Sequence, residues 1–261
     1  MGNPHGTPIW YELLTSDPDA AAAFYGDVVG WTCAGFGGTA GGDADGYRVF
    51  TAPDGEGVGG LMRLPPPMAG QGPVWLFYIG VDDVDAAAAK VAAGGGAVHM
   101  PPTTLEGVGR LAMVTDPGGA AFYLMRGASP EASTAFKRMA PGHGEWNELY
   151  APDDQAALAF YAEQFGWTKE GAMPMGEMGE YSFLGHDGGM IGAVMKAPPG
   201  ERPRWNHFFR TGQIDAAKAR VEAGGGTVTW GPQEVPGGDW VIYATDPQGA
   251  AFGLVGNKGT E

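Results

Sequence analysis

The chain contains a long internal repeat, and this repeat limits the folds that the sequence can adopt. The segment 9–31 returns without gaps at 145–167, and Trp10 corresponds to Trp146, a shift of 136 residues. Two further segment pairs recur later in each half at a shift of 130 residues, which places a net deletion in the second copy. Self-similarity over most of the length indicates a tandem duplication.

A fainter repeat divides each half again. The run Asp-Ala-Ala-Ala-Ala occurs at 19–23 and at 85–89. Each resulting module reads as a strand, an alanine-rich helix and three short strands, so the sequence predicts an α+β fold of four βαβββ modules. The modules span residues 8–64, 74–126, 145–197 and 204–256.

A module of about 60 residues buries too little apolar surface to fold alone, so the modules must pair. The sequence predicts an N-terminal domain at 1–126, a linker at 127–144 and a C-terminal domain at 145–261. The connectors between modules are short, and this favours pairing within each half.

The first strand shows how the pattern places side chains. Residues 8–15 favour a strand, in which Trp10 and Glu12 share one face because side chains alternate. Asp17 then acts as an N-cap ahead of a helix that stops at Gly30. The same signals recur in the second half.

Charge and composition exclude several classes of partner. The formal net charge is −15, which argues against nucleic acid and against an anionic membrane surface. Cys33 is the only cysteine, and no segment approaches the length of a transmembrane span or matches a secretory signal. We therefore expect a cytoplasmic protein. Paired modules form a cleft, which suits a small organic molecule as the partner, and we expect a monomer or homodimer.

The motifs resemble a known family. W-x-E-L, D-x-x-x-A-x-x-F-Y and G-W in the first module, then V-D-D-V-D-A-A, G-G-G and T-D-P-x-G-A-x-F, look like the vicinal oxygen chelate superfamily. This superfamily includes glyoxalases, bleomycin-resistance proteins and extradiol dioxygenases, and the tandem form resembles two-domain glyoxalase-like proteins of actinobacteria. The resemblance implies two domains with curved mixed sheets, each with a cleft for a small ligand. A shared fold does not by itself specify the chemistry.

The resemblance also says where metal ligands would stand. Members that use a metal carry a His on the first strand of a module and a Glu or His on the last. The corresponding opening positions are Trp10, Leu76, Trp146 and Asn206, and the closing ones are Tyr123, Gly253 and residues near Gly60 and Gly192. None is a strong ligand for a divalent transition metal, so we expect no metal cofactor. The alternative is one divalent metal ion held by shifted ligands from among Glu12, Glu148, His143 and His207.

Aromatic and polar residues fall on the strand faces that would line the clefts. The expected ligand-binding residues are Trp10, Tyr78, Tyr123, Trp146, Asn206, Phe208 and Arg210. Such a lining suits an aromatic or cationic ligand, and it suggests detoxification, antibiotic resistance or secondary metabolism. The enzymatic alternative is a lyase, isomerase or oxygenase of the glyoxalase or dioxygenase type.

Glu12 and Glu148 are the candidate catalytic residues. A carboxylate on an apolar face has a raised pKa, so it can accept protons near neutral pH. The alternative is structural: each Glu forms an ion pair with Arg48 or Arg210 and ties strands together. His207 should point to the helix side of its strand, which favours a place in the core over metal binding.

Overall fold

The computed structural model describes residues 2–36, 46–68 and 70–259. These residues form two eight-stranded mixed sheets, and the described part of the chain includes four α-helices, which confirms the predicted α+β class. The strand orders are β2-β3-β4-β1-β5-β8-β7-β6 and β10-β11-β12-β9-β13-β16-β15-β14. Each sheet therefore draws its strands from one half of the duplication.

The first half contains the first sheet, two α-helices and a short 3-10 turn. In chain order these are β1 (Pro8–Thr15), α1 (Pro18–Val29), β2 (Thr32–Gly35), β3 (Arg48–Thr51), β4 (Gly57–Arg63), η2 (Pro66–Met68), β5 (Val74–Gly80), α2 (Val84–Ala93), β6 (Ala97–Leu105), β7 (Gly109–Thr115) and β8 (Ala121–Gly127).

The second half repeats this order. Its elements are β9 (Gly144–Ala151), α3 (Asp154–Phe165), β10 (Thr168–Pro174), η3 (Gly176–Met178), β11 (Glu180–His186), β12 (Gly189–Lys196), β13 (Arg204–Gln213), α4 (Ile214–Ala223), β14 (Thr227–Glu234), β15 (Trp240–Thr245) and β16 (Ala251–Asn257). The predicted modules are thus present as βαβββ units.

The first and last strands of each module run parallel, and the other pairs within a module are antiparallel. Glu12 of β1 lies opposite Gly60 of β4, and Glu148 of β9 lies opposite Ala193 of β12. Phe208 of β13 lies opposite Gly253 of β16, and Tyr78 of β5 lies opposite Tyr123 of β8. This register decides which side chains share a face.

Helix boundaries follow the expected signals. The Asp17 side chain accepts a hydrogen bond from the amide of Ala20 at 3.1 Å, and Gly30 ends α1 with φ +89°. Asp153 and Gly166 repeat both features on α3. No helix in the described ranges is both long enough and apolar enough to cross a membrane.

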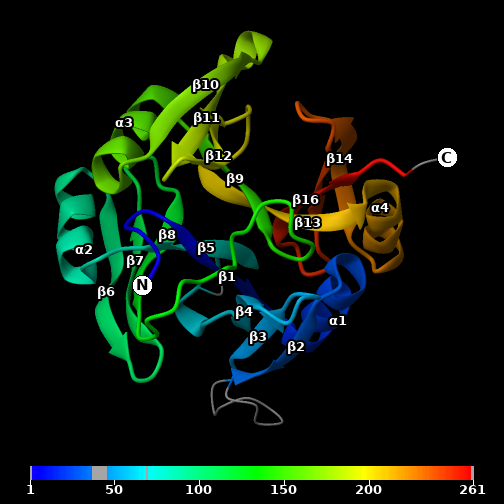
Figure 1. The fold of residues 1–261 in the computed structure, drawn as a ribbon, viewed down its shortest axis with the longest axis horizontal. Coiled ribbons are helices and arrows are strands. Elements are labelled where there is room, and N and C mark those ends of the chain that lie inside the picture. Colours follow the sequence, from blue (N-terminus) through cyan, green and yellow to red (C-terminus); the bar gives the residue numbers. More distant parts are fainter. Residues whose placement is uncertain (1, 37–45, 69, 260–261) are drawn as a thin grey trace. The chain divides into compact units, whose positions relative to one another are not determined.

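The helices pair across the halves, in contrast to the sheets. Helix α1 packs against α4, and α2 packs against α3 (Figure 1). The chain forms two compact units: unit 1 comprises Met1–Ile9, Phe77–Ser133 and Trp146–Asn206, and unit 2 comprises Trp10–Leu76, Thr134–Glu145 and His207–Glu261. The expectation that modules pair within each half is therefore wrong for the helices. The domain boundaries read from the repeats stay a prediction.

A buried chain of hydrogen bonds, from a Trp to a Tyr to an Asp, supports each unit. In unit 1, the Trp205 indole donates to the Tyr161 hydroxyl at 2.9 Å, and that hydroxyl donates to Asp116 at 3.1 Å. Unit 2 repeats the chain with Trp75, Tyr25 and Asp246, at 2.8 and 3.1 Å. Each tyrosine and its aspartate come from different halves, so this bond ties a helix of one half to a turn of the other.

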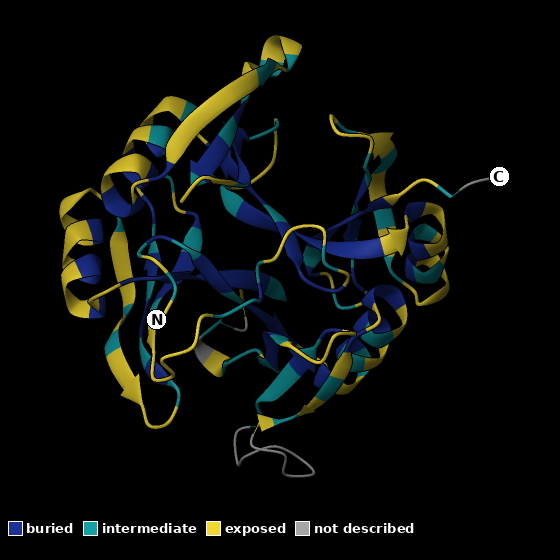
Figure 2. Cartoon of the chain, in the orientation of Figure 1, coloured by how far each residue is buried: buried dark blue, intermediate teal, exposed yellow. Residues whose placement is uncertain are grey.

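The cores around these chains are aromatic. Figure 2 shows that each helix buries one face and exposes the other, as expected for a helix that covers a sheet. The buried rings of unit 1 include Phe77, Phe122, Tyr161, Phe165, Trp167 and Trp205, and those of unit 2 include Tyr11, Tyr25, Trp31, Phe50, Trp75, Phe209 and Phe252. Most of their contacts are tilted or edge-to-face, the arrangements that aromatic quadrupoles favour.

Alkaline conditions should destabilise the fold through Tyr25 and Tyr161. Burial, and next the charge of the neighbouring aspartate, raise the pKa of each hydroxyl well above 10.0. An unfolded tyrosine ionises near its ordinary pKa, so this stability is fully present below pH 10 and is lost as the pH rises further. The free energy of unfolding in urea, measured from pH 8 to 11, should fall.

The variants Tyr25→Phe and Tyr161→Phe test the same bonds. Each should lose about 1–3 kcal/mol at pH 8, because a buried aspartate loses its donor. The double variant should show a shallower alkaline decline than the unchanged protein. Identical slopes would contradict this account of the core.

Candidate ligand-binding site

The buried carboxylate of Glu148 lies on β9 between two aromatic residues. Trp146, Glu148 and Tyr150 alternate with Asn147 and Leu149, so the three share one face of the strand. The Glu148 side chain is fully buried, whereas Trp146 is half-buried. The neighbouring Arg204 and Asn206 of β13 alternate with Trp205, which packs on Tyr161 of α3. The Glu148 face is therefore opposite to the helix side.

Neutral donors hold the carboxylate in place. The Asn206 amide nitrogen donates to Oε1 of Glu148 at 3.4 Å, and the Tyr181 hydroxyl of β11 also bonds the carboxylate. Trp146 in turn donates its indole N–H to the Tyr181 oxygen at 2.8 Å. Burial, followed by the charge of Glu148, raises the pKa of Tyr181 well above 10.0, so this hydroxyl remains a donor at neutral pH.

Arg204 fixes the orientation of the Asn206 side chain. Its Nε donates to Oδ1 of Asn206 at 2.8 Å, which leaves the amide nitrogen to face Glu148. The guanidinium lies over the Tyr150 ring, 4.9 Å from its centroid, and forms an ion pair with Glu201. We define the Glu148 face as Trp146, Glu148, Tyr150, Tyr181, Arg204 and Asn206. All of these residues belong to unit 1.

The first half has a related but less polar arrangement in unit 2. Glu12 is also buried, and Trp10 donates its indole N–H to the Tyr47 hydroxyl at 3.1 Å, as Trp146 does to Tyr181. At the position of Asn206, however, the first half carries Leu76, and at the position of Arg204 it carries Val74. Both copies therefore carry the Trp–Tyr pair. Only the second copy carries the polar residues Arg204 and Asn206.

Space as well as chemistry is unfavourable at the positions that the resemblance assigns to metal ligands. A side chain at Gly60 would meet the Tyr47 hydroxyl at 2.0 Å from its Cβ, and one at Gly253 would meet the Phe208 ring at 2.1 Å. At Gly192 a Cβ would lie 1.9 Å from the backbone oxygen of Asn147. Tyr123 stacks on Tyr78 at 4.3 Å between centroids. Over residues 2–36, 46–68 and 70–259 no group of three His, Cys, Asp or Glu is placed to share a metal. The residues present do not fit a divalent ion at these positions.

The histidines considered as shifted ligands have other roles. His143 bonds the Thr134 carbonyl at 2.6 Å and the Asp54 carboxylate at 3.0 Å. His207 is buried with its ring edge-on to Tyr11 at 5.3 Å, which agrees with the predicted core position. Burial lowers the pKa of His207 to about 3, so the ring is neutral at physiological pH.

The ion pairs considered for the two glutamates are formed by other partners. Arg48 pairs with Asp19 at 2.6 Å. Arg210 holds Asp239 through two bonds of 2.5 and 2.9 Å and also reaches Asn257. Each arginine therefore has an acidic partner on a neighbouring segment, and pairing of Glu12 or Glu148 with either one stays a hypothesis.

The structure brings together only some of the predicted ligand-binding residues. Trp146, Glu148 and Asn206 meet on the Glu148 face, and Tyr78 and Tyr123 stack on each other in the same unit. Phe208 and Arg210 belong to unit 2, where Phe208 packs edge-on against Tyr243. Whether these residues bind a ligand stays a prediction.

Sequence reasoning missed Tyr47, Tyr181, Tyr150 and Arg204. A signal existed for the first two, because a tyrosine recurs at 47 and 181, near the start of corresponding strands of the two halves. Tyr150 and Arg204 have no such signal, since neither residue type recurs in the other half.

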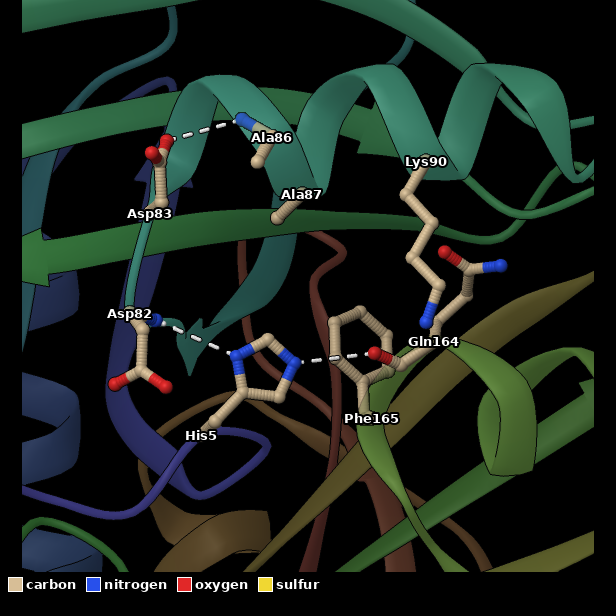
Figure 3. Close-up of a pocket in the computed structure, with 8 residues that line it drawn as sticks. All are labelled: His5, Asp82, Asp83, Ala86, Ala87, Lys90, Gln164 and Phe165. Carbon is tan, nitrogen blue, oxygen red and sulfur yellow. Dashed lines mark hydrogen bonds between the residues drawn. The ribbon is translucent and has the colours of Figure 1, made fainter.

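A separate pocket of about 250 Å³ lies in unit 1 between α2 and the end of α3 (Figure 3). The His5 ring spans it, accepting a bond from the Asp82 amide at 3.3 Å and reaching the Gln164 carbonyl at 3.1 Å. Lys90 bonds the Glu163 carbonyl. The pocket shares no residue with the Glu148 face, and its polar groups are largely engaged with backbone.

Comparison with known proteins identifies the family. The model of the glyoxalase/bleomycin resistance protein/dioxygenase superfamily matches residues 8–124 and 143–254. The chain belongs to this superfamily. The predicted resemblance is confirmed, and each match covers one half of the duplication.

Two curated relatives cover nearly the whole length of this superfamily member. The chain is 34% identical over 252 residues to "Putative glyoxylase CFP32" of Mycobacterium tuberculosis, covering 96% of this chain and 94% of that protein. It is 31% identical over 271 residues to "Anthracycline biosynthesis protein DnrV" of Streptomyces peucetius, covering 96% and 93%.

Solved structures share the fold at low identity. The Mn(II)-bound glyoxalase from Novosphingobium aromaticivorans matches with a TM-score of 0.67 and 22% identity, covering 98% of this chain and 84% of that one. The 2,3-dioxygenase LapB from Pseudomonas sp. KL28 matches with a TM-score of 0.67 and 16% identity, covering 98% and 94%. At these identities the likeness shows the fold alone.

Acid should destabilise unit 2 through His207. Its pKa is about 3 in the folded chain and near 6.5 when unfolded, so its contribution is present above pH 6.5 and is lost as the pH falls toward 3. The variant His207→Phe should show a smaller fall in unfolding free energy between pH 7 and 4. His99→Phe, at an exposed strand position, is the control and should retain the full fall.

Proposed function

We propose that this protein binds a small organic molecule with an aromatic ring and a cationic group on the Glu148 face, without a metal ion. The observation that carries this proposal is a fully buried carboxylate flanked by Trp146, Tyr150 and Tyr181. A cation gains both a charge contact with such a carboxylate and cation–π contacts with the surrounding rings.

The partial exposure of the rings supports a ligand site more than a sealed core. Trp146, Tyr181 and Phe183 are half-buried, while Glu148 is fully buried. Aromatic walls over a polar anchor are typical of small-molecule sites, where apolar surface gives affinity and a few polar groups give orientation. A bound ring would cover the exposed parts of these side chains.

Metal independence is part of the proposal. It is supported by the residue types at the positions of the family's metal ligands, which coordinate metals poorly. It is also supported by the side-chain and backbone atoms that leave no room for a side chain at Gly60, Gly192 and Gly253. His143 forms hydrogen bonds within the protein and His207 lies in the core, and both observations support it further. The similarity to the anthracycline biosynthesis protein DnrV supports secondary metabolism as the setting for this chain.

Glu148 also suits a role as proton acceptor if the ligand presents an acidic group. Its donors include Asn206 and Tyr181, which hold the carboxylate in one orientation inside a buried site. A positioned base gains most from such preorganisation. This enzymatic role is the second candidate, and it uses the same residue as the binding role.

Binding of tyramine should separate the two copies. Tyramine carries one aromatic ring and one ammonium group, and 4-methylphenol is a similar ring without the charge. Glu148→Gln should weaken tyramine binding by about tenfold or more in calorimetry, because it removes the charge that faces the ammonium. The matched change Glu12→Gln, and 4-methylphenol with either variant, are the controls and should show little difference. Equal affinity of tyramine for the unchanged protein and Glu148→Gln would count against the proposal.

Removal of metal should leave binding unchanged. Protein treated with a chelator and checked by elemental analysis should bind tyramine with the affinity of untreated protein. If affinity appeared only after a divalent ion was added back, the metal-free proposal would be wrong.

A further inference from the structure

Arg204 has binding capacity beyond the bonds it forms within the protein. Its Nε donates to Asn206 and its Nη1 to Glu201, and its plane lies over the Tyr150 ring. Within the described part of the chain, no hydrogen bond engages its Nη2. A third of the side chain is exposed. The guanidinium is thus held in place by these contacts, and its Nη2 is still available as a donor.

The position of this guanidinium relative to Glu148 is set by a single amide. Asn206 bridges Nε of Arg204 and Oε1 of Glu148 with bonds of 2.8 and 3.4 Å. The two bridged atoms, Nε of Arg204 and Oε1 of Glu148, are therefore at most about 9 Å apart, and Nη2 belongs to the same guanidinium. A ligand with an ammonium and a carboxylate on one carbon, each with one hydrogen bond, spans a distance of this order.

We propose that Arg204 is a second polar anchor of the Glu148 face and that the ligand carries a carboxylate beside its cationic group. The inference rests on the proposed function for the ammonium and the ring, and it adds the carboxylate and the residue that holds it. Guanidinium is suited to this contact because its N–H groups lie in a plane that matches a carboxylate. Packing on Tyr150 and the bond to Asn206 reduce the side-chain entropy that binding would otherwise cost.

The duplication provides an internal comparison. The first half keeps the Trp–Tyr pair and the buried Glu12 but has Val74 and Leu76 in place of Arg204 and Asn206. If Arg204 and Asn206 only supported the sheet, apolar residues could take their positions, as Val74 and Leu76 do in the first half. The presence of Arg204 and Asn206 around Glu148 alone points to recognition of a polar ligand group by that copy.

Three probes test the inference on the full chain. Tyramine has the ring and the ammonium, 3-(4-hydroxyphenyl)propionate has the ring and the carboxylate, and L-tyrosine has all three groups. We expect L-tyrosine to bind about tenfold tighter than tyramine, the gain of one charge-assisted hydrogen bond. Arg204→Ala should abolish this gain and weaken the propionate, while tyramine binding changes by less than about twofold.

Matched variants show whether the effect is specific. Asn206→Leu, which copies the first half, should also remove the preference for L-tyrosine over tyramine. Arg126→Ala removes another exposed arginine of unit 1, paired with Asp82, and should leave all three affinities unchanged. Thermal unfolding of each variant shows that a loss of affinity does not come from loss of fold.

The outcomes separate this inference from the proposed function. If tyramine binds through Glu148 but L-tyrosine binds no tighter, or keeps its advantage in Arg204→Ala, the role of Arg204 is wrong and the proposed function stands. If tyramine fails to bind while the propionate binds in an Arg204-dependent manner, the cationic group is wrong and Arg204 stands as an anchor. If neither carboxylate probe depends on Arg204, the inference is overturned.

Discussion

The hydrogen bond from a helix tyrosine to a turn aspartate of the other half is the constraint on which the structure depends. Tyr161 to Asp116 and Tyr25 to Asp246 each bury a carboxylate, and a buried carboxylate without donors is costly. The aspartates also accept backbone amides in their own turns, at 2.8 and 2.9 Å from Ala120 and Ala250. Each helix must therefore lie over a turn that the opposite half supplies.

This arrangement explains why the helices and the sheets follow different rules. Every strand pairs with strands of its own half, where the connectors are short. The helices α1 and α4, and α2 and α3, instead share aromatic cores built around the buried tyrosines. Large rings in edge-to-face contact fill these cores, and the opposite sheet face stays available for a polar site.

The Glu148 face shows how a duplicated scaffold can diverge. Both copies keep a tryptophan bonded to a tyrosine and a buried glutamate two residues further along the strand. Only the second copy carries Arg204 and Asn206, which fix the carboxylate and leave part of the guanidinium exposed. Two substitutions on one strand thus separate a polar site from an apolar one, while the core beneath keeps the same aromatic framework.

The sequence by itself determined the four modules, the strand and helix boundaries near Asp17 and Gly30, and the family, because local periodicity and capping act over a few residues. It also placed Trp146, Glu148 and Asn206 on one face through strand alternation. Only the tertiary structure decided that the helices pair across halves, that Arg210 binds Asp239, and that Tyr181 and Arg204 join Glu148. These contacts link residues far apart in the chain, and a single sequence holds no local signal for which distant partner a buried charge will find.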